Sequence, residues 1–218
     1  TAFVETKKAA LTFDDGPSPL YTERLLDGLK ERGVVATFFV TGENAESCPD
    51  LIRREKADGH LIGNHTYSHI QLTSDNKEVF REELVKTNEI LKAITGENVT
   101  YIRPPYGSYN DTLKSVAGAP LVFWSVDPED WEYRDADVVT NNIMSTVKDG
   151  DIVLLHDLYK TSVEAAIRVV DKLQAEGYEF VTVKELLRRR GVEAENGGVY
   201  SKARNNGMNL GPLVYEID

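Results

Sequence analysis

The sequence is poor in cysteine and in long apolar runs. Cys48 is the single cysteine among 218 residues, so the chain forms no internal disulfide and builds no zinc site from several thiolates. No run approaches the roughly 20 apolar residues that a membrane-spanning helix needs. No basic leader followed by an apolar stretch opens the chain, so no signal peptide is visible. We therefore expect a globular protein with no membrane span in this chain.

Basic residues are also scarce. The chain has 25 lysines and arginines against 36 aspartates and glutamates, which gives a net charge of −11. Nucleic-acid binding depends on lysine and arginine to displace counterions, so we expect no nucleic-acid partner. The dense basic run at 188–190 is expected at a helix end, where cations suit the helix dipole. Because an acidic surface repels polyanions, a neutral substrate is favoured over a phosphorylated one.

What the sequence does contain is a regular alternation of short apolar runs with amphipathic segments. The expected strands are 9–13, 34–40, 60–64, 99–103, 121–126, 151–156 and 180–183. The expected helices are 19–32, 49–56, 75–94, 109–116, 136–147, 162–176 and 183–190. About seven such repeats predict an α/β fold of parallel strands covered by helices. A barrel and a doubly wound open sheet both fit this pattern.

The longest expected helix spans residues 75–94. Residues 73–75 offer side chains that can cap its start, and Gly96 lies just past its end. The residues expected along its apolar side are Val79, Phe80, Leu84, Val85 and Leu91.

Two adjacent aspartates, Asp14 and Asp15, stand between the first expected strand and a turn at Gly16 and Pro17. Successive side chains of a strand point to opposite faces, but at a strand end that turns, both carboxylates can reach one site. Two close carboxylates repel each other, and a bound cation or a proton on one of them relieves the repulsion. The same residues are good turn formers, so this pattern alone leaves a structural turn as an equal alternative.

His65 and His69 are four residues apart, a spacing that places both imidazoles on one face of a helix. Two imidazoles so placed can bind one metal ion, as in proteins with an HExxH motif, although the glutamate of that motif is absent here. The chain has only four histidines, which makes the pairing informative. A chance pair of surface histidines is the alternative.

Three further polar clusters follow expected strands. Arg103 stands before two prolines, which hold it in an extended form and so aim its side chain; a rigid connector with a solvated arginine is the alternative. The segment 127–131 places carboxylates and an indole at another strand end, and His156 ends an apolar strand, where a structural histidine is the commoner outcome. All five clusters stand at the carboxyl ends of expected strands, where β/α proteins assemble active sites.

These five motifs, in this order, resemble the carbohydrate esterase family 4 polysaccharide deacetylases, which share the NodB-homology domain. The resemblance covers about residues 8–190. It implies a distorted, incomplete (β/α) barrel of about seven parallel strands, and so favours the barrel over the open sheet. The matching stretches are Thr12-Phe13-Asp14-Asp15-Gly16-Pro17-Ser18, His65-Thr66-Tyr67-Ser68-His69, Arg103-Pro104-Pro105-Tyr106-Gly107, Asp127-Pro128-Glu129-Asp130-Trp131 and Leu154-Leu155-His156.

The resemblance also implies a metal centre beside a general base. Asp15, His65 and His69 bind one divalent metal ion, with zinc expected and cobalt, nickel or manganese as alternatives. Asp14 takes a proton from the attacking water as general base, and Arg103 holds and orients its carboxylate.

A general acid and a substrate pocket complete the implied site. His156 protonates the leaving amine, and either Asp127 or Asp130 is the carboxylate that keeps it charged. The residues expected to line the substrate pocket are Tyr106, Trp131 and Leu154.

The implied reaction is metal-dependent hydrolysis of N-acetyl groups on β-1,4-linked N-acetylglucosamine polymers, either peptidoglycan or chitin oligosaccharides, with release of acetate. An O-deacetylase acting on acetylated xylan through the same site is the nearest alternative, and a carbohydrate-binding pseudoenzyme is a more distant one. The partner is then a polysaccharide or oligosaccharide, and we expect a monomer. Such substrates lie outside the cell, so we expect an extracellular or cell-surface protein whose signal or anchor lies outside this chain.

Two segments differ in character along the chain. Residues 1–192 are expected to form the catalytic domain, whereas 193–218 lack helical periodicity and are expected to be an irregular extension, packed on the domain or flexible. The residues expected to pack it back are Val199, Tyr200, Leu213, Val214 and Tyr215.

Overall fold

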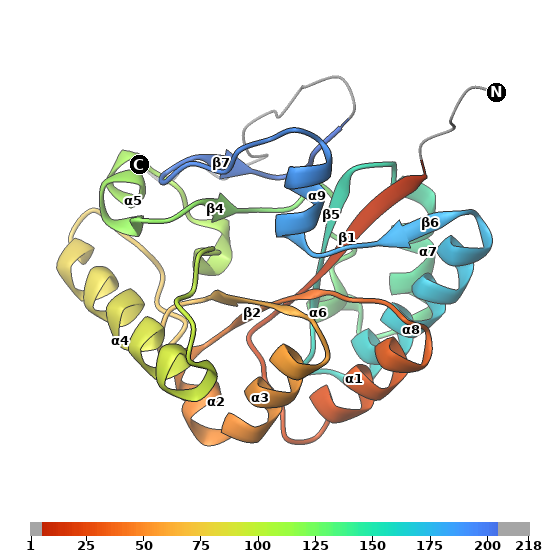
Figure 1. The fold of residues 1–218 in the computed structure, drawn as a ribbon, viewed down its shortest axis with the longest axis horizontal. Coiled ribbons are helices and arrows are strands. Elements are labelled where there is room, and N and C mark those ends of the chain that lie inside the picture. The colour runs from red at the N-terminus through yellow and green to blue at the C-terminus, as the bar shows by residue number, and fades with distance from the viewer. Residues whose placement is uncertain (1–5, 205–218) are drawn as a thin grey trace.

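The computed structural model describes residues 6–204, and its centre is a sheet of parallel strands. In spatial order these are β3 (Leu61–Asn64), β2 (Thr37–Val40), β1 (Lys7–Asp14) and β5 (Asp151–His156), with β6 (Tyr178–Phe180) also pairing with β1. Ala9 pairs with β5 and β6, and Thr12 with β5 and β2, so β6 and β2 lie along the same side of β1. Figure 1 shows β1 crossing the middle of the molecule, with helices around it.

Two more strands, β4 (Leu121–Val122) and β7 (Val199–Tyr200), form a separate parallel pair. Single parallel bridges connect this part to the larger sheet, because Ile102 bridges both Asn64 and Leu121, and Val126 bridges Val153. The strands therefore curve round toward each other, but continuous ladders do not run the whole way through residues 6–204. The predicted α/β fold, a distorted and incomplete parallel barrel, is confirmed.

Strand pairing near 99–103 and 121–126 is shorter than predicted. In a parallel ladder the next donor to the Val122 carbonyl would be residue 104, but Pro104 has no N–H. The Nε of Arg103 donates to that carbonyl instead, at 3.0 Å. A guanidinium thus replaces the backbone at the point where the ladder stops. The residues that do pair there are Ile102, Leu121, Val122 and, further on, Val126.

Helices cover the outside of the strands. They are α1 (Thr22–Glu31), α2 (Gly42–Ser47), α3 (Pro49–Ala57), α4 (Lys77–Thr95), α5 (Asp111–Ala117), α6 (Asp130–Tyr133), α7 (Ala136–Thr146), α8 (Lys160–Ala175) and α9 (Val183–Arg189), with a 3-10 turn, η1, at Pro105–Gly107. The sequence predicts all of these except α2, α6 and η1, which are too short to show apolar periodicity. None of the helices within residues 6–204 is long and apolar enough to cross a membrane.

The longest helix, α4, buries Phe80, Leu84 and Leu91 as predicted, but not Val79 and Val85. Val79 and Val85 are half exposed, at 49% and 48%, because they flank the buried face. The helix also begins after Asn76, later than the caps expected at 73–75, and it ends as expected at Gly96, whose φ is 77°. The buried residues are Phe80, Leu84, Thr87 and Leu91, which follow helical spacing.

Alternate residues of β1 face two different cores. Leu11 and Phe13 pack in the larger apolar cluster with residues of α1 and α8, whereas Ala10 packs in a second cluster with residues of α9. Because side chains alternate along a strand, Thr12 and Asp14 lie on the same face as Ala10. The strand therefore delivers a buried carboxylate to the barrel interior at its carboxyl end.

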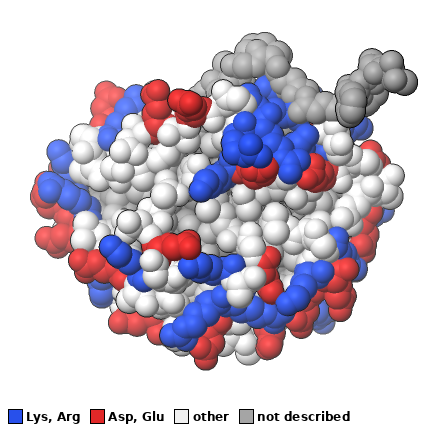
Figure 2. Space-filling model, in the orientation of Figure 1, with Lys and Arg blue, Asp and Glu red and all other residues white. Residues whose placement is uncertain are grey.

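Charged residues on the face seen in Figure 1 lie beside charges of opposite sign, as Figure 2 shows for the basic group over α9. Arg188 and Arg189 each pair with Glu185, at 2.7 and 2.6 Å, and Arg190 pairs with Asp149 at 2.5 Å. The basic run is thus at a helix end, as predicted, and its charges are compensated locally.

The segment after α9 folds back onto the strands. Val199 and Tyr200 form β7 against β4, and the Ala203 N–H donates to the Gly150 carbonyl at 2.8 Å. The other expected packing residues, Leu213, Val214 and Tyr215, lie outside the described residues.

Candidate active site

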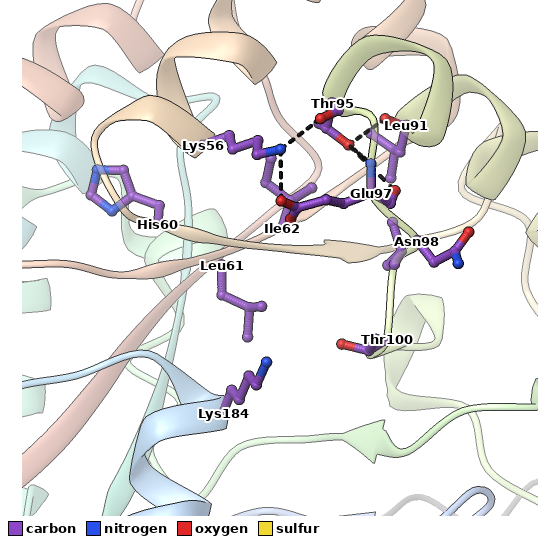
Figure 3. A pocket seen from close by; sticks show the side chains of 11 residues that line it. Lys56, His60, Leu61, Ile62, Leu91, Thr95, Glu97, Asn98, Thr100 and Lys184 are labelled. Atoms are coloured by element: carbon purple, nitrogen blue, oxygen red, sulfur yellow. Dashed lines mark hydrogen bonds and ion pairs between the residues drawn. The ribbon is translucent and has the colours of Figure 1, made fainter.

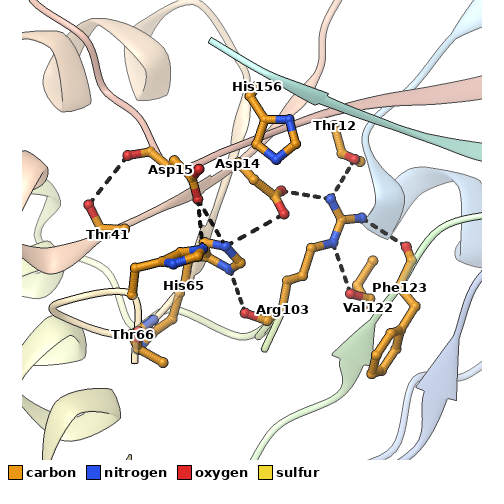
Figure 4. A network of polar contacts seen from close by, with 12 residues as sticks. Thr12, Asp14, Asp15, Thr41, His65, Thr66, Arg103, Val122, Phe123 and His156 are labelled. Atoms are coloured by element: carbon orange, nitrogen blue, oxygen red, sulfur yellow. Dashed lines mark hydrogen bonds and ion pairs between the residues drawn. The ribbon is translucent and has the colours of Figure 1, made fainter. Parts of the chain in front are cut away.

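Four segments far apart in the sequence meet at the carboxyl ends of the strands. Asp14 ends β1, His156 ends β5, the loop from His65 to His69 follows β3, and Arg103 follows the bridge at Ile102. Figure 4 shows these side chains pointing toward one another from their separate elements. The prediction that the motifs share one edge is confirmed.

Asp15, His65 and His69 bring one carboxylate and two imidazoles together. Their ligand atoms all lie within 4.8 Å of one another, and the Asp15 Oδ1 is 3.2 Å from the Nε2 of each histidine. His65 Nδ1 lies 2.7 Å from the Arg103 carbonyl, which accepts only from a protonated nitrogen, so the Nε2 lone pair faces Asp15. Lone pairs converging in this way fit a divalent cation.

Burial and hydrogen bonding act in opposite directions on Asp15. Burial raises the pKa of its carboxyl, but the close imidazoles of His65 and His69 and the charge of His156 outweigh burial and hold the pKa well below its usual range. The carboxylate therefore stays charged and available as a ligand at neutral pH.

The loop that carries the two histidines is not helical, so the predicted helix face is wrong. Thr66 and His69 have φ values of +66° and +59°, and these left-handed residues, rather than helical spacing, bring the imidazoles together. Glu83 of α4 holds the loop: its carboxylate accepts from the backbone N–H of Tyr67 at 3.1 Å and of Ser68 at 2.9 Å. It also accepts from the Ser68 hydroxyl. No sequence motif marks Glu83.

Asp14 is bound to a buried arginine rather than to the imidazole pair. The Arg103 Nη1 donates to Asp14 Oδ1 and to Thr12 Oγ1, both at 2.7 Å. Its guanidinium stacks 4.3 Å from the centre of the Phe39 ring and is completely buried. Burial lowers the pKa of Arg103, and the charge of Asp14 opposes that effect. Asp14 Oδ2 lies 3.6 Å from His65 Nε2, so this second oxygen faces the two imidazoles and Asp15.

His156 pairs with Asp130, which answers a question that the sequence leaves open. The His156 Nδ1 donates to Asp130 Oδ1 at 2.8 Å, and the Asp130 Oδ2 accepts from the His156 backbone N–H at 2.8 Å and from Ser162 Oγ at 2.5 Å. Burial lowers the pKa of His156, but the Asp130 hydrogen bond and charge raise it to about 9. Asp127 instead accepts from the Glu129 N–H at 2.9 Å, and burial raises its pKa.

These groups line one pocket of about 510 Å³. Tyr106 and Trp131 are 61% and 48% exposed at its rim, and Leu154 is buried in its wall. The Tyr106 ring lies 4.7 Å from that of His69. The pocket-lining residues that the sequence does not single out are Pro104, Gly107, Trp124, Glu129 and Tyr159.

The turn after Asp15 is held by a carboxyl that no motif assigned. Asp157, completely buried, accepts from the Thr22 hydroxyl, and Thr22 Oγ1 in turn accepts from the Ser18 N–H at 2.7 Å. Burial raises the pKa of Asp157 to about 7. Gly16 has no room for a Cβ, which would overlap the Asp157 carboxyl oxygens.

A second cavity, of about 140 Å³, lies at the start of β3 rather than beyond its end (Figure 3). Lys56 donates to the Thr95 carbonyl at 2.6 Å and pairs with Glu97 at 2.8 Å, and His60 Nδ1 accepts from the Ala36 N–H at 3.0 Å. These polar groups serve the fold and are not arranged for chemistry.

Comparison with known proteins agrees with this geometry. The polysaccharide deacetylase family matches residues 3–120. The chain is 43% identical over 180 residues to the peptidoglycan-N-acetylglucosamine deacetylase PgdA of Listeria monocytogenes, which covers 83% of this chain and 39% of that protein. It is 41% identical over 151 residues to the chitooligosaccharide deacetylase of Sinorhizobium fredii, covering 67% of this chain and 70% of that protein.

A solved structure is also similar. The family 4 acetyl xylan esterase of Clostridium thermocellum, in complex with a cobalt ion, superposes with a TM-score of 0.81 at 34% identity, covering 86% of this chain and 93% of that one. The chain spans about two-fifths of the length of the first curated relatives it matches. By fold, by motif and by sequence, the chain belongs to the polysaccharide deacetylase family.

Proposed function

We propose that the protein is a metal-dependent hydrolase that removes N-acetyl groups from β-1,4-linked N-acetylglucosamine polymers and releases acetate. The observation that carries this proposal is that two adjacent aspartates have different partners. Asp15 faces two imidazoles, Asp14 is held by Arg103, and His156 stands charged beside the same pocket. Metal-dependent amide hydrolysis uses these three functions together: a metal ligand set, a base and an acid.

The metal ligands proposed are Asp15, His65 and His69. A carboxylate and two imidazoles that leave further coordination positions open are suited to catalytic zinc, with cobalt, nickel or manganese as alternatives. A divalent ion bound there supplies an acidified water and polarises the acetamide carbonyl. The chain's own contribution is to hold the two histidines in place: the Arg103 carbonyl binds His65 Nδ1, and Glu83 binds the loop that leads to His69.

The base proposed is Asp14. Its Oδ1 is occupied by Arg103, so Oδ2 is the oxygen available to take a proton from water. A bound arginine also restricts the rotation of the carboxylate, and it keeps the negative charge of Asp14 compensated in a buried position. Arg103 is therefore the positioning residue of the base.

The acid proposed is His156, with Asp130 as its partner. Its Nδ1–H is taken by Asp130, so the Nε2–H is the proton that can pass to the leaving nitrogen. With a pKa of about 9, the imidazolium is present at neutral pH. Asp127 acts at a greater distance, through its charge on Arg103 and His156. Trp131 and Leu154 would enclose the acetyl methyl, and Tyr106 would contact the sugar.

An amide is favoured over an ester by the same acid. A sugar amine leaves poorly unless its nitrogen is protonated, whereas a sugar alkoxide leaves with less help. An imidazolium that is present at neutral pH, and can give up its proton, thus fits N-deacetylation better. O-deacetylation of xylan is the second candidate, because a structural relative is named as an acetyl xylan esterase. A carbohydrate-binding pseudoenzyme is disfavoured, since the proposed ligands, base and acid all meet in one pocket.

Acetate release from peptidoglycan, chitin oligosaccharides and acetylated xylan tests the proposal in one panel. We expect release from at least one of the first two, and loss of that release in Asp14→Asn. Release from xylan alone would assign the O-deacetylase instead, and no release from any substrate by metal-loaded protein would refute the hydrolase.

Two further proposals concern the setting of this activity. We propose that residues 1–192 are the catalytic domain and that the following segment supports it through β7. We also propose that the protein acts at or outside the cell surface, because glycans of this class are found there.

A further inference from the structure

One pocket carboxylate has no partner. Glu129 lines the active-site pocket and is exposed, and no hydrogen bond or ion pair involves its carboxylate within residues 6–204. The other pocket carboxylates are engaged: Asp14 by Arg103, Asp15 by two imidazoles and Asp127 by a backbone N–H. Within residues 6–204, Glu129 is therefore the pocket carboxylate with both oxygens free to bind a ligand.

The backbone of Glu129 adopts a strained conformation. Its φ and ψ are 56° and 43°, the left-handed region that residues other than glycine seldom adopt. Its N–H donates to Asp127 Oδ1 at 2.9 Å, and the residue after it, Asp130, is the buried partner of His156. An unusual conformation at the residue next to the acid's partner is the kind of feature found at functional sites.

Glu129 lies at the pocket rim, away from the floor where the acetamide would react. Asp14 and His65 are 3% and 2% exposed at the floor, whereas Glu129 is exposed at the rim near the half-exposed Trp131. An acetamide undergoing hydrolysis occupies the floor, beside the proposed base and acid. The rim is then occupied by a neighbouring sugar of the same chain.

We propose that Glu129 binds the primary ammonium group of an already deacetylated sugar, next to the acetamide being hydrolysed. This inference rests on the proposed function, because that reaction itself produces such amines. Each turnover then creates a ligand for the next one, and deacetylation spreads along a chain from its first site. A fully acetylated neighbour offers Glu129 only neutral groups.

The same ammonium chemistry occurs in the amino groups of peptides attached to peptidoglycan, and the structure favours the sugar source. Glu129 lies in the pocket that holds the glycan, two residues from Trp131, whose indole suits the face of a sugar ring. The two sources are separable with defined substrates.

The test compares two tetrasaccharides of β-1,4-linked glucosamine, one fully acetylated and one lacking a single acetyl group. We expect the wild-type protein to show a ratio of kcat/KM that favours the partly deacetylated substrate by about two- to fivefold, the effect of one exposed ion pair. Glu129→Gln should bring that ratio to about one. The control Glu132→Gln changes an exposed carboxylate of α6, the helix that begins directly after Glu129. Glu132 does not line the pocket, so this variant should keep the wild-type ratio.

Binding of the fully deacetylated tetrasaccharide supplies a readout that needs no turnover. Calorimetry should give a Kd that rises about two- to fivefold in Glu129→Gln, with the difference shrinking in high salt. Equal ratios and equal Kd values in wild type and Glu129→Gln would overturn the inference while leaving the hydrolase intact. An effect of Glu129→Gln confined to acetylated glycan that carries peptide would also overturn it, by assigning the ammonium to the peptide. Failure of the hydrolase would appear separately, as absence of acetate release from every substrate.

Discussion

Replacing Asp130 by asparagine should convert the proposed acid from a charged to a neutral histidine. Burial lowers the pKa of His156, and the Asp130 carboxylate overcomes burial and raises that pKa from 6.5 to about 9. An asparagine can still accept from the His156 backbone N–H and from Ser162, but its amide cannot stabilise the imidazolium. The pKa of His156 in Asp130→Asn should therefore fall to 6.5 or below.

The size of the effect on activity follows from these values. At pH 7.5 a pKa of about 9 leaves about 97% of His156 protonated, whereas a pKa of 6.5 leaves about 10%. We expect kcat/KM at pH 7.5 to fall about tenfold or more, and the alkaline limb of its pH profile to move from near pH 9 to pH 6.5 or lower. Ser162→Ala is the matched control, because it removes one donor to Asp130 and leaves the carboxylate.

Stability should change with pH in the same direction. A histidine whose pKa is raised by folding contributes stability that is fully present below pH 6.5 and is lost as pH rises through about 9. A rise of this size corresponds to about 3 kcal/mol in the free energy of unfolding, and the His156 side chain is only 13% exposed. Wild type should lose up to that amount between pH 6.5 and 9.5 in urea unfolding, and Asp130→Asn should lose much less.

Two measurements can refute this reasoning. With only four histidines in the chain, the His156 resonance can be assigned by NMR and titrated directly. A His156 pKa near 9 that persists in Asp130→Asn would show that Asp130 is not what sustains the charge. An unshifted alkaline limb would show that His156 is not the acid, even if its pKa moves.

Three other substitutions test the rest of the site. Metal analysis should find about one divalent ion per chain, lost in His65→Ala, and metal-free protein with full activity would contradict the ligand assignment. Asp14→Asn should keep the metal but lower kcat by about 10²- to 10⁴-fold, because the base is removed while the ligands stay; unchanged turnover would exclude Asp14 as base. Glu83→Gln should weaken metal affinity about 10- to 100-fold in a competition titration, since it loosens the histidine loop, and unaltered affinity would mean the loop holds itself.

Sequence patterning is reliable where packing and local geometry agree. β5 has the predicted bounds because residues 152–155 form an uninterrupted apolar run between Asp151, which follows a glycine turn, and His156. In α4 the sequence pattern does not determine which face is buried. The apolar residues, which include Val79 and Val85, cover an arc of the helix wider than one buried face. Only the position of neighbouring elements selects the face that contains Phe80 and Leu84.

The two histidine side chains lie together as predicted, although the local structure predicted for them is wrong. The i, i+4 spacing predicted a helix, but the loop is irregular, and Thr66 and His69 adopt left-handed conformations. Those conformations persist because Asn64 Oδ1 accepts from the Thr66 N–H at 2.8 Å and Glu83 accepts from the residues that follow. Contacts between a loop and a helix more than a dozen residues away leave no local trace in the sequence.

The adjacent aspartates illustrate the opposite case, in which local rules do determine the site. Asp14 is the last residue of β1, so strand alternation directs its side chain to the interior face shared with Thr12, where Arg103 binds both. Asp15 lies beyond the end of the strand and has a φ of 74°, but its backbone N–H still donates to the Phe39 carbonyl at 3.2 Å. In a continuing strand the Asp15 side chain would point to the opposite face from Asp14. Because the chain turns at Asp15, both carboxylates lie at the same site. Two neighbouring residues of one type can therefore have different partners in one site: Asp15, the proposed metal ligand, lies beside two imidazoles, and Asp14, the proposed base, is held by a guanidinium.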